Sequence, residues 1–251
     1  MQICKQAQGM QFGWNPQAPD YRDYKFTAPL KALPKSTNRL TTSLPIYDQQ
    51  RLGACVSCGC ARLWQHRRLM ERQGCSMASR LFIYYQGRAI EGTIPWDSGL
   101  WVRDGMKVLA KWGAPYETEW PYNIRRFTWK PPTTAYKKAL NDIALEYRAV
   151  QPNLNALKAA LAAGNPIVGG FSVFSSFVSD YVARTGLMPM PKKGEARLGG
   201  HCVTFDAFSD SDQTFWCANS WGTDWGIGGW FKMPYANLSN CADFWVLTKV
   251  K

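Results

Sequence analysis

The chain carries the residue types that acyl transfer through sulfur requires. Cys55 follows Gln49 by six residues, and a histidine and an asparagine, His201 and Asn219, come far downstream in that order. In such chemistry a cysteine thiolate attacks a carbonyl, an imidazole carries the proton, and an amide orients the imidazole. A further amide near the cysteine can donate to the oxyanion that forms on attack.

Three motifs resemble those of the papain-like (C1) cysteine peptidases: the segment that carries Gln49 and Cys55, and two downstream blocks. Residues 219–226 read Asn-Ser-Trp-Gly-Thr-Asp-Trp-Gly, similar to the family's Asn-Ser-Trp-Gly-x-x-Trp-Gly block, and residues 200–203 read Gly-His-Cys-Val, similar to its Gly-His-Ala-Val strand. His201 lies 146 residues and Asn219 164 residues after Cys55. The family places both roughly 130–150 residues after its nucleophile, so the order agrees and the asparagine is slightly late. The resemblance extends from about residue 45 to residue 250.

Cys55 is the expected nucleophile. It lies at the start of a predicted helix, where the helix dipole favours an anion, and a neighbouring imidazolium would also lower the pKa of its thiol. The lowered pKa is what the family resemblance implies. The alternative is a buried cysteine that acts only as a small apolar side chain.

The chain has only two histidines, so the base can be chosen by helix length. His66 is 11 residues beyond Cys55 in the same predicted helix, which separates them by roughly 16 Å along the axis. That distance leaves His201 as the base, with His66 as a surface or packing residue. The resemblance then assigns Asn219 to orient the His201 ring and Trp221 to cover their hydrogen bond.

The resemblance also implies an oxyanion donor and parts of the substrate site. Gln49 has the expected spacing from the cysteine, and the adjacent Gln50 is the competing candidate. Gly99 falls where the family pairs its backbone with substrate, although it could equally be a helix-entry turn. We expect Gly200 and Trp221 to contribute to substrate binding as well.

Neither a cofactor nor a metal is expected. Cys58 completes a Cys-x-x-Cys spacing with Cys55, but no second pair and no nearby histidine supply a zinc set. We therefore interpret Cys58 and Cys60 as helix packing. Cys202 and Cys217 lie on predicted strands, and a disulfide between them is possible but not predicted.

The elements that must position these residues are predicted in two groups. Helical spacing and capping residues predict helices over about 53–72, 79–88, 101–112 and 153–163. Apolar runs separated by Gly, Asp, Ser and Asn predict strands over 167–174, 201–208, 214–219, 229–233 and 243–248. Helices followed by strands indicate an α+β protein. The resemblance implies two lobes, a helical one and an antiparallel β-barrel-like one, with the active site between them.

The chain is therefore divided into three segments of one papain-like unit. Residues 1–44 form an N-terminal arm, residues 45–150 a mainly helical lobe with the nucleophile, and residues 151–251 a mainly β lobe with the histidine and asparagine. The arm lacks the long helical run of the inhibitory propeptides of secreted relatives. We expect it to pack on the lobes, and an autoinhibitory strand in the cleft is the alternative.

Composition limits the partners and the compartment. The chain has 251 residues, 46% hydrophobic content and a formal net charge of +12. The charge is typical of a solvated surface or of an acidic partner, but no nucleic-acid motif accompanies it. Residues 1–10 lack the apolar run of a signal peptide, and no stretch is long enough to cross a membrane. Leu52 stands where secreted relatives carry a disulfide-bonded cysteine, which favours a reducing cytoplasm. A host cytoplasm and association with a virion are both possible.

The function expected from the resemblance is a cysteine endopeptidase, a hydrolase that cuts peptide bonds of proteins through an acyl-enzyme. Several segments are similar to the phage and bacterial branch of the family, including residues 79–88 and 119–122. Two alternatives stay open: a peptidoglycan peptidase or amidase with the same residues, and a papain-like structural component of a phage particle. Oligomeric state is not predicted.

Overall fold

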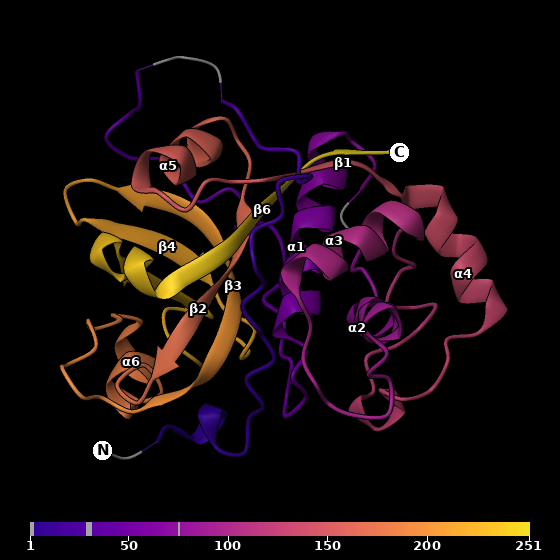
Figure 1. Ribbon diagram of the computed structural model, residues 1–251, viewed down its shortest axis with the longest axis horizontal. Helices are drawn as coiled ribbons and strands as arrows, with labels where there is room; N and C mark the ends of the chain where they lie inside the picture. Colours follow the sequence, from indigo (N-terminus) through magenta and orange to yellow (C-terminus); the bar gives the residue numbers. More distant parts are fainter. Residues whose placement is uncertain (1–2, 29–31, 75) are drawn as a thin grey trace.

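The computed structural model describes residues 3–28, 32–74 and 76–251, so part of the arm expected over residues 1–44 lies outside the described residues. A helical lobe and a β lobe lie side by side, as expected of an α+β papain-like fold (Figure 1). The N-terminal segment runs along the seam between them (Figure 1). Both lobes therefore contact a third piece of chain that lies between them.

The helical lobe is built around a long helix, α1 (Cys55–Met70), with α2 (Arg80–Glu91), α3 (Val102–Lys111) and α4 (Thr133–Ala139). Helix α2 begins where the Ser79 side chain accepts a hydrogen bond from the Phe82 N–H, and it ends at Gly92 in the left-handed conformation. These are the usual capping devices for unpaired groups at helix ends. Helix α1 packs against α2 and α3 and, on its other side, against the sheet.

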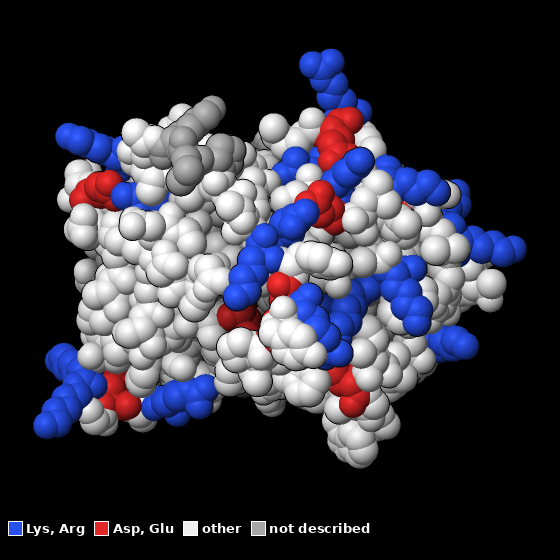
Figure 2. Space-filling model, turned by 45° about the horizontal axis from the view of Figure 1, so that its top comes forward, with Lys and Arg blue, Asp and Glu red and all other residues white. Residues whose placement is uncertain are grey.

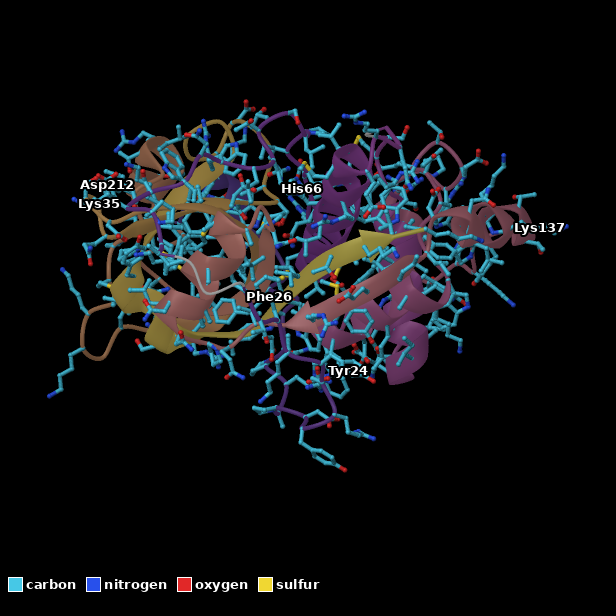
Figure 3. The ribbon with its side chains drawn as sticks, turned by 90° about the horizontal axis from the view of Figure 1, so that it is seen from above. Tyr24, Phe26, Lys35, His66, Lys137 and Asp212 are labelled. Atoms are coloured by element: carbon cyan, nitrogen blue, oxygen red, sulfur yellow. The ribbon has the colours of Figure 1, made fainter. Side chains whose placement is uncertain are left out.

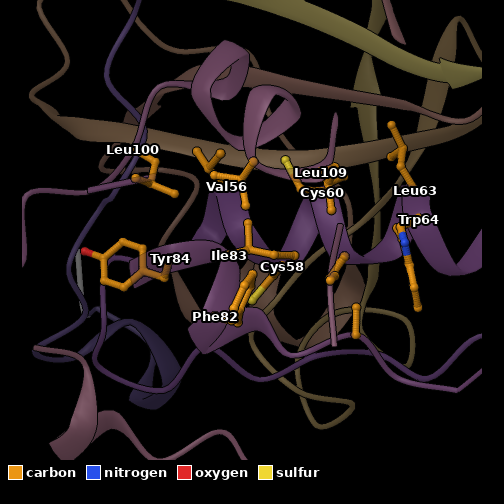
Figure 4. Packing of buried hydrophobic residues seen from close by; sticks show 14 of the residues in the cluster. Val56, Cys58, Cys60, Leu63, Trp64, Phe82, Ile83, Tyr84, Leu100 and Leu109 are labelled. Carbon is orange, nitrogen blue, oxygen red and sulfur yellow. The ribbon is translucent and has the colours of Figure 1, made fainter. Parts of the chain in front are cut away.

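One apolar cluster fills the interior of the helical lobe. Val56, Cys60 and Leu63 of α1 meet Phe82 and Ile83 of α2 in this cluster (Figure 4). The three α1 residues are spaced by four and three positions, which puts them on one face of the helix. Helix α1, which begins with Cys55, is thus held by packing along most of its length.

The β lobe contains one antiparallel sheet of six strands in the order β1-β6-β2-β3-β4-β5. The strands are β1 (Ala144–Ala149), β2 (Ile167–Phe174), β3 (Arg197–Ser209), β4 (Thr214–Ala218), β5 (Trp230–Pro234) and β6 (Cys241–Val250). Helices α5 (Leu154–Ala162) and α6 (Asp180–Thr185) lie in the same lobe (Figure 1). A second apolar cluster, rich in phenylalanine and tryptophan, lies within this lobe.

The four predicted helices and five predicted strands are all present, with ends that differ by a few residues. The sequence did not predict α4, α6 or β1, or the four short 3₁₀ helices Lys5–Ala7, Ile124–Arg126, Leu140–Asp142 and Tyr235–Asn240. Helices α4 and α6 have only seven and six residues, too few to show a helical period. Strand β1 is recognisable only through its pairing with the distant β6.

The later part of the arm is tied firmly to both lobes. The buried Arg62 guanidinium of α1 donates to the backbone oxygens of Thr41 and Pro45, and the Asp206 carboxylate of β3 accepts from the Thr41 N–H. Arg39 lies over the rings of Trp216 and Trp230, 4.9 Å from each ring centroid. This region therefore fastens the helical lobe to the β lobe.

The surface charge is unevenly distributed. On the face shown in Figure 2, Lys and Arg side chains gather over the helical lobe and the seam, while much of the β lobe is uncharged. Among the described residues, no helix has both the length and the apolar character needed to cross a membrane.

Candidate functional site

Cys55 is the first residue of α1, at the end of a tight turn. The turn is held by Asp97, whose two carboxylate oxygens each lie 3.0 Å from the Gly53 N–H. Tyr84 of α2 donates its hydroxyl to the same carboxylate and accepts a hydrogen bond from the Gly99 N–H. These contacts fix the backbone just before Cys55, at the positive end of the helix dipole.

His201 lies on β3 and Asn219 directly follows the adjacent strand β4, and the two form a buried pair. The His201 Nε2 and the Asn219 Oδ1 are 2.7 Å apart, and the same Oδ1 accepts from the Ser220 N–H at 2.8 Å. Because an amide oxygen only accepts, Nε2 carries the proton and Nδ1 is the basic nitrogen. The Trp221 ring lies 5.0 Å from the His201 ring, centroid to centroid, and helps to enclose the pair.

The Cys55 sulfur lies beside the strand that carries the histidine. The backbone N–H of Cys202, the residue after His201, faces this sulfur, as does the N–H of Val56. The structure therefore places Cys55, at the start of α1, beside the residue that follows His201 on β3, and it pairs His201 with Asn219 at the end of β4. His201 Nδ1 has no hydrogen-bond partner among the described residues.

Gln49 is fully buried in the same region, whereas Gln50 is exposed and has a positive φ of 56°. The Gln49 amide nitrogen donates to the Leu52 carbonyl at 2.9 Å and to the Gln11 carbonyl at 3.3 Å. Its oxygen accepts from the Ser220 hydroxyl at 2.7 Å. Since Ser220 follows Asn219, the glutamine amide is positioned by the same chain segment as the histidine.

Residues 11–14, here named the covering segment, lie directly over Cys55. The Gly13 N–H faces the Cys55 sulfur, and the Gly13 carbonyl accepts from the Leu100 N–H at 2.8 Å. A Cβ on Gly13 would come within 1.8 Å of the Gly53 carbonyl oxygen. Only glycine fits at this point, and beneath it Cys55 has no exposed surface.

The two glycines expected in the substrate site both contact the covering segment. The Trp14 N–H donates to the Gly200 carbonyl at 3.0 Å, and a Cβ on Gly99 would lie 2.1 Å from the Gly13 carbonyl oxygen. Gly99 has a φ of +74°, so it serves both as a turn and as a point of close approach. The turn expected for Gly99 is therefore present, and the pairing of its backbone with substrate stays a prediction.

Burial beneath the covering segment shifts both reacting groups toward their neutral forms. It raises the pKa of Cys55 to about 11 and lowers the pKa of His201 to about 4. The sequence interpretation implied a lowered pKa for the cysteine, and for this closed conformation that expectation is wrong. Loss of solvent outweighs the backbone N–H groups that favour the thiolate.

The remaining expectations concern the other histidine and the other cysteines. His66 lies within α1 (Figure 3), where its Nε2 is 3.2 Å from the Gly164 carbonyl, so it is a packing residue. Cys58 and Cys60 are buried in the helical-lobe cluster, as interpreted from the sequence. Cys202 and Cys217 are both free thiols. Within the described residues, no group of three or more His, Cys, Asp or Glu side chains could hold a metal ion.

Sequence reasoning missed several residues that shape the site. Asp97 holds the Cys55 turn and Ser220 holds the Gln49 amide, but neither was among the expected site residues. Gly13 and Trp14 belong to the N-terminal arm, within which the sequence singled out no individual residue. The signal that could have found them is the glycine–tryptophan pair in a polar segment, because an isolated tryptophan there needs a buried place to pack.

Comparison of this chain with known proteins finds a matching family. Residues 39–243 match the model of the papain family cysteine proteases. An uncharacterized peptidase C1-like protein of Acanthamoeba polyphaga mimivirus is 35% identical over 272 residues, covering 95% of this chain and 87% of the relative.

Solved structures agree with this match. Xylellain, a cysteine protease from Xylella fastidiosa, has a TM-score of 0.90 and 38% identity, covering 96% of each chain. The Carica candamarcensis cysteine protease, solved in complex with E-64, has a TM-score of 0.67 and 17% identity. It covers 86% of this chain and 99% of its own, and at that identity the likeness concerns the fold alone.

Proposed function

The chain belongs to the papain family of cysteine proteases, and we propose that Cys55 is its nucleophile and His201 its proton carrier. It is thus a hydrolase that binds peptide substrates. In the proposed mechanism Asn219 orients the His201 ring, and the Gln49 amide donates to the oxyanion. The neutral amide of Asn219 suits this task because the negative charge of the reacting pair already lies on sulfur.

The reaction then runs in two steps on one sulfur atom. His201 Nδ1 takes the thiol proton, the sulfur bonds to the carbonyl carbon, and the oxyanion faces the Gln49 amide and the Cys55 N–H. The carbon–nitrogen bond breaks as His201 returns the proton to the leaving amine. Water, deprotonated by His201, cleaves the thioester and releases the acid.

One observation carries the assignment: the His201–Asn219 hydrogen bond sits next to the Cys202 N–H that faces the Cys55 sulfur. It fixes the proton on Nε2 and leaves Nδ1 as the nitrogen that can accept the thiol proton. A buried histidine that served only packing would not require a cysteine at a helix start beside it.

We also propose that the covering segment keeps the enzyme latent. For Cys55 to attack a peptide bond, the carbonyl carbon of that bond must face the sulfur while the oxygen of the same carbonyl faces the oxyanion donor. Here the sulfur faces the Gly13 N–H, whereas the Gln49 amide faces the Gln11 carbonyl. The Gly13 carbonyl points instead to the Leu100 N–H. The segment therefore fills the site without presenting a bond that Cys55 can cut.

Hydrolysis of an unfolded protein such as reduced casein tests the proposal. We expect activity in full-length Trp14→Ala protein, where the covering segment is weakened, and no activity in the double variant Trp14→Ala, Cys55→Ala. The role proposed for Cys55 is wrong if the double variant retains the activity. The role proposed for His201 is wrong if its replacement by glutamine leaves the rate of hydrolysis unchanged. Circular dichroism and urea unfolding show that each variant is folded.

A further inference from the structure

Cys58 is a buried thiol that no step of peptide hydrolysis uses. It follows Cys55 by three residues in α1 and is only 2% exposed (Figure 4). Side chains three residues apart lie on one side of a helix, with their Cβ atoms about 5–6 Å apart. Redox proteins carry Cys-x-x-Cys pairs with this spacing. The first turn of α1 therefore offers the reacting sulfur a second sulfur close by.

A buried cation faces the Cys58 sulfur. The Arg80 guanidinium of α2 lies there, held by two hydrogen bonds to the Glu117 carboxylate at 2.6 and 3.0 Å and by one to the Asp48 carbonyl at 3.0 Å. It also lies over two tyrosine rings. A guanidinium beside a cysteine favours the thiolate, so Arg80 stabilises the charge that develops when Cys58 attacks.

In the closed protein both thiols are neutral and shielded. Burial raises the pKa of Cys58 to about 12, although Arg80 acts in the opposite direction. Cys55 has no exposed surface beneath the covering segment. When that segment leaves, Cys55 becomes accessible, whereas Cys58 still faces α2 inside the helical lobe. A small oxidant in solution therefore reacts at Cys55 and reaches Cys58 only through it.

We propose that Cys58 is a resolving thiol that rescues Cys55 after oxidation by hydrogen peroxide. The Cys55 sulfur, with its proton passed to His201, attacks one peroxide oxygen. The O–O bond breaks, Cys55 becomes a sulfenic acid, and the departing hydroxide takes the proton from His201 as water. The Cys58 sulfur then attacks the Cys55 sulfur, the S–O bond breaks, and the second hydroxide leaves as water with the Cys58 proton.

The product is a Cys55–Cys58 disulfide, formed as one peroxide is reduced to two waters. The Cβ atoms of a disulfide are about 3.5–4.5 Å apart, so the first turn of α1 must tighten by about 1–2 Å. The first residue of a helix can move in this way because its own N–H has no partner within the helix. A strained disulfide is also easily reduced, so the bond protects the nucleophile reversibly. This inference rests on the proposed role of Cys55 and adds a modification to it.

Cys202 is the rival partner for Cys55. Its N–H faces the Cys55 sulfur, and with Cys58 it lines a cavity of about 10 Å³. Burial raises the pKa of Cys202 well above its usual value, and the neighbouring thiols and Asp243 raise it further. Cys58 instead has Arg80 to oppose this effect. It also needs movement only within one helical turn, not between a helix and a strand. These differences favour Cys58.

The test exposes folded Trp14→Ala protein to excess hydrogen peroxide, removes the peroxide with catalase, and then adds dithiothreitol. We expect peroxide to abolish casein hydrolysis and dithiothreitol to restore most of it. Adding Cys58→Ala should leave the starting activity unchanged but raise the permanently lost activity at least about threefold, because an unresolved sulfenic acid goes on to acids that thiols do not reduce. Cys60→Ala, which removes an equally buried thiol two residues further on, is the matched control and should recover like its parent.

Peptide mapping identifies the bond. Trypsin releases Cys55, Cys58 and Cys60 together on residues 52–62, and a disulfide within this peptide lowers its mass by two hydrogen atoms. Alkylation before reduction marks the cysteine that stays free, which should be Cys60. The Cys60→Ala variant should still form the bond.

Other outcomes count against the inference in distinguishable ways. A disulfide between Cys55 and Cys202, or a recovery that is the same with and without Cys58, would show that Cys58 does not resolve the oxidised nucleophile. The proposed peptidase function would then stand. If Trp14→Ala protein has no activity before peroxide is added, the proposed function fails, and the mass of the peptide 52–62 still decides whether the disulfide forms.

Discussion

Replacing Trp14 by alanine should expose Cys55 without touching any reacting residue. The tryptophan is buried and hydrogen-bonded in the closed state, and removing a buried indole costs about 3–5 kcal/mol. Only the closed state contains these contacts, so the closed-to-open equilibrium shifts by the same amount. At about 1.4 kcal/mol for each factor of ten, the open fraction rises by a factor between about 10² and several thousand.

Alkylation by iodoacetamide, followed by peptide-resolved mass spectrometry, measures this change. When opening and closing are fast, the labelling rate of a buried thiol is proportional to the open population. The Cys55 rate should therefore rise by at least about 100-fold in Trp14→Ala. Cys60, which is buried in the helical lobe, reports on global unfolding in the same sample and should stay unlabelled.

Tyr24→Ala is the matched control. Tyr24 belongs to the same arm, but it is 77% exposed. This variant should label Cys55 at the wild-type rate. A change of less than about threefold in Trp14→Ala would refute this role of Trp14. So would a wild-type Cys55 that already reacts as fast as a small free thiol.

Three further predictions concern the oxyanion donor, the histidine and the fit of the indole. In Trp14→Ala protein, Gln49→Ala should lower kcat by about 10²- to 10³-fold, while Gln50→Ala should leave kcat within about threefold. Equal losses of kcat in the two variants would contradict Gln49 as the oxyanion donor. The lowered pKa of His201 means that, as pH falls from 6.5 to about 4, the unfolded chain gains a proton that the folded chain resists. The free energy of unfolding should therefore fall over that pH range by about 3 kcal/mol more in the wild type than in His201→Gln. Urea titrations at several pH values measure this difference. Equal pH dependence of the free energy of unfolding in the two proteins would contradict it. Gly170→Ala should also speed alkylation of Cys55, because its Cβ would collide with the indole, and an unchanged rate would show that the indole can move aside at little cost.

The parts of the fold that the sequence predicted are those with local signals. Helix α2 has a serine cap and a terminal glycine, and β2 is a continuous apolar run whose observed bounds match the predicted range. Helix α6 is too short for a period, and β1 is defined by a partner about 100 residues away. Those elements depend on tertiary contacts that a single sequence does not display.

The same distinction applies to the candidate site. Cys55, His201 and Asn219 sit in motifs with fixed spacing, and helix length alone separated His201 from His66. The covering segment has no such motif: its residues act through backbone N–H and carbonyl groups, which every residue possesses. Its effect on the pKa of Cys55 is likewise a matter of burial, and burial by a distant segment is not encoded locally.

The central claim is that Cys55 and His201 form one reacting pair beneath a removable segment. An epoxysuccinyl probe that traps active-site thiolates, applied to Trp14→Ala protein and followed by peptide mapping, tests it most directly. We predict a single adduct on Cys55 that disappears when His201 is also replaced by alanine. Adducts spread over several cysteines, or an adduct on Cys55 that forms equally fast without His201, would contradict the account.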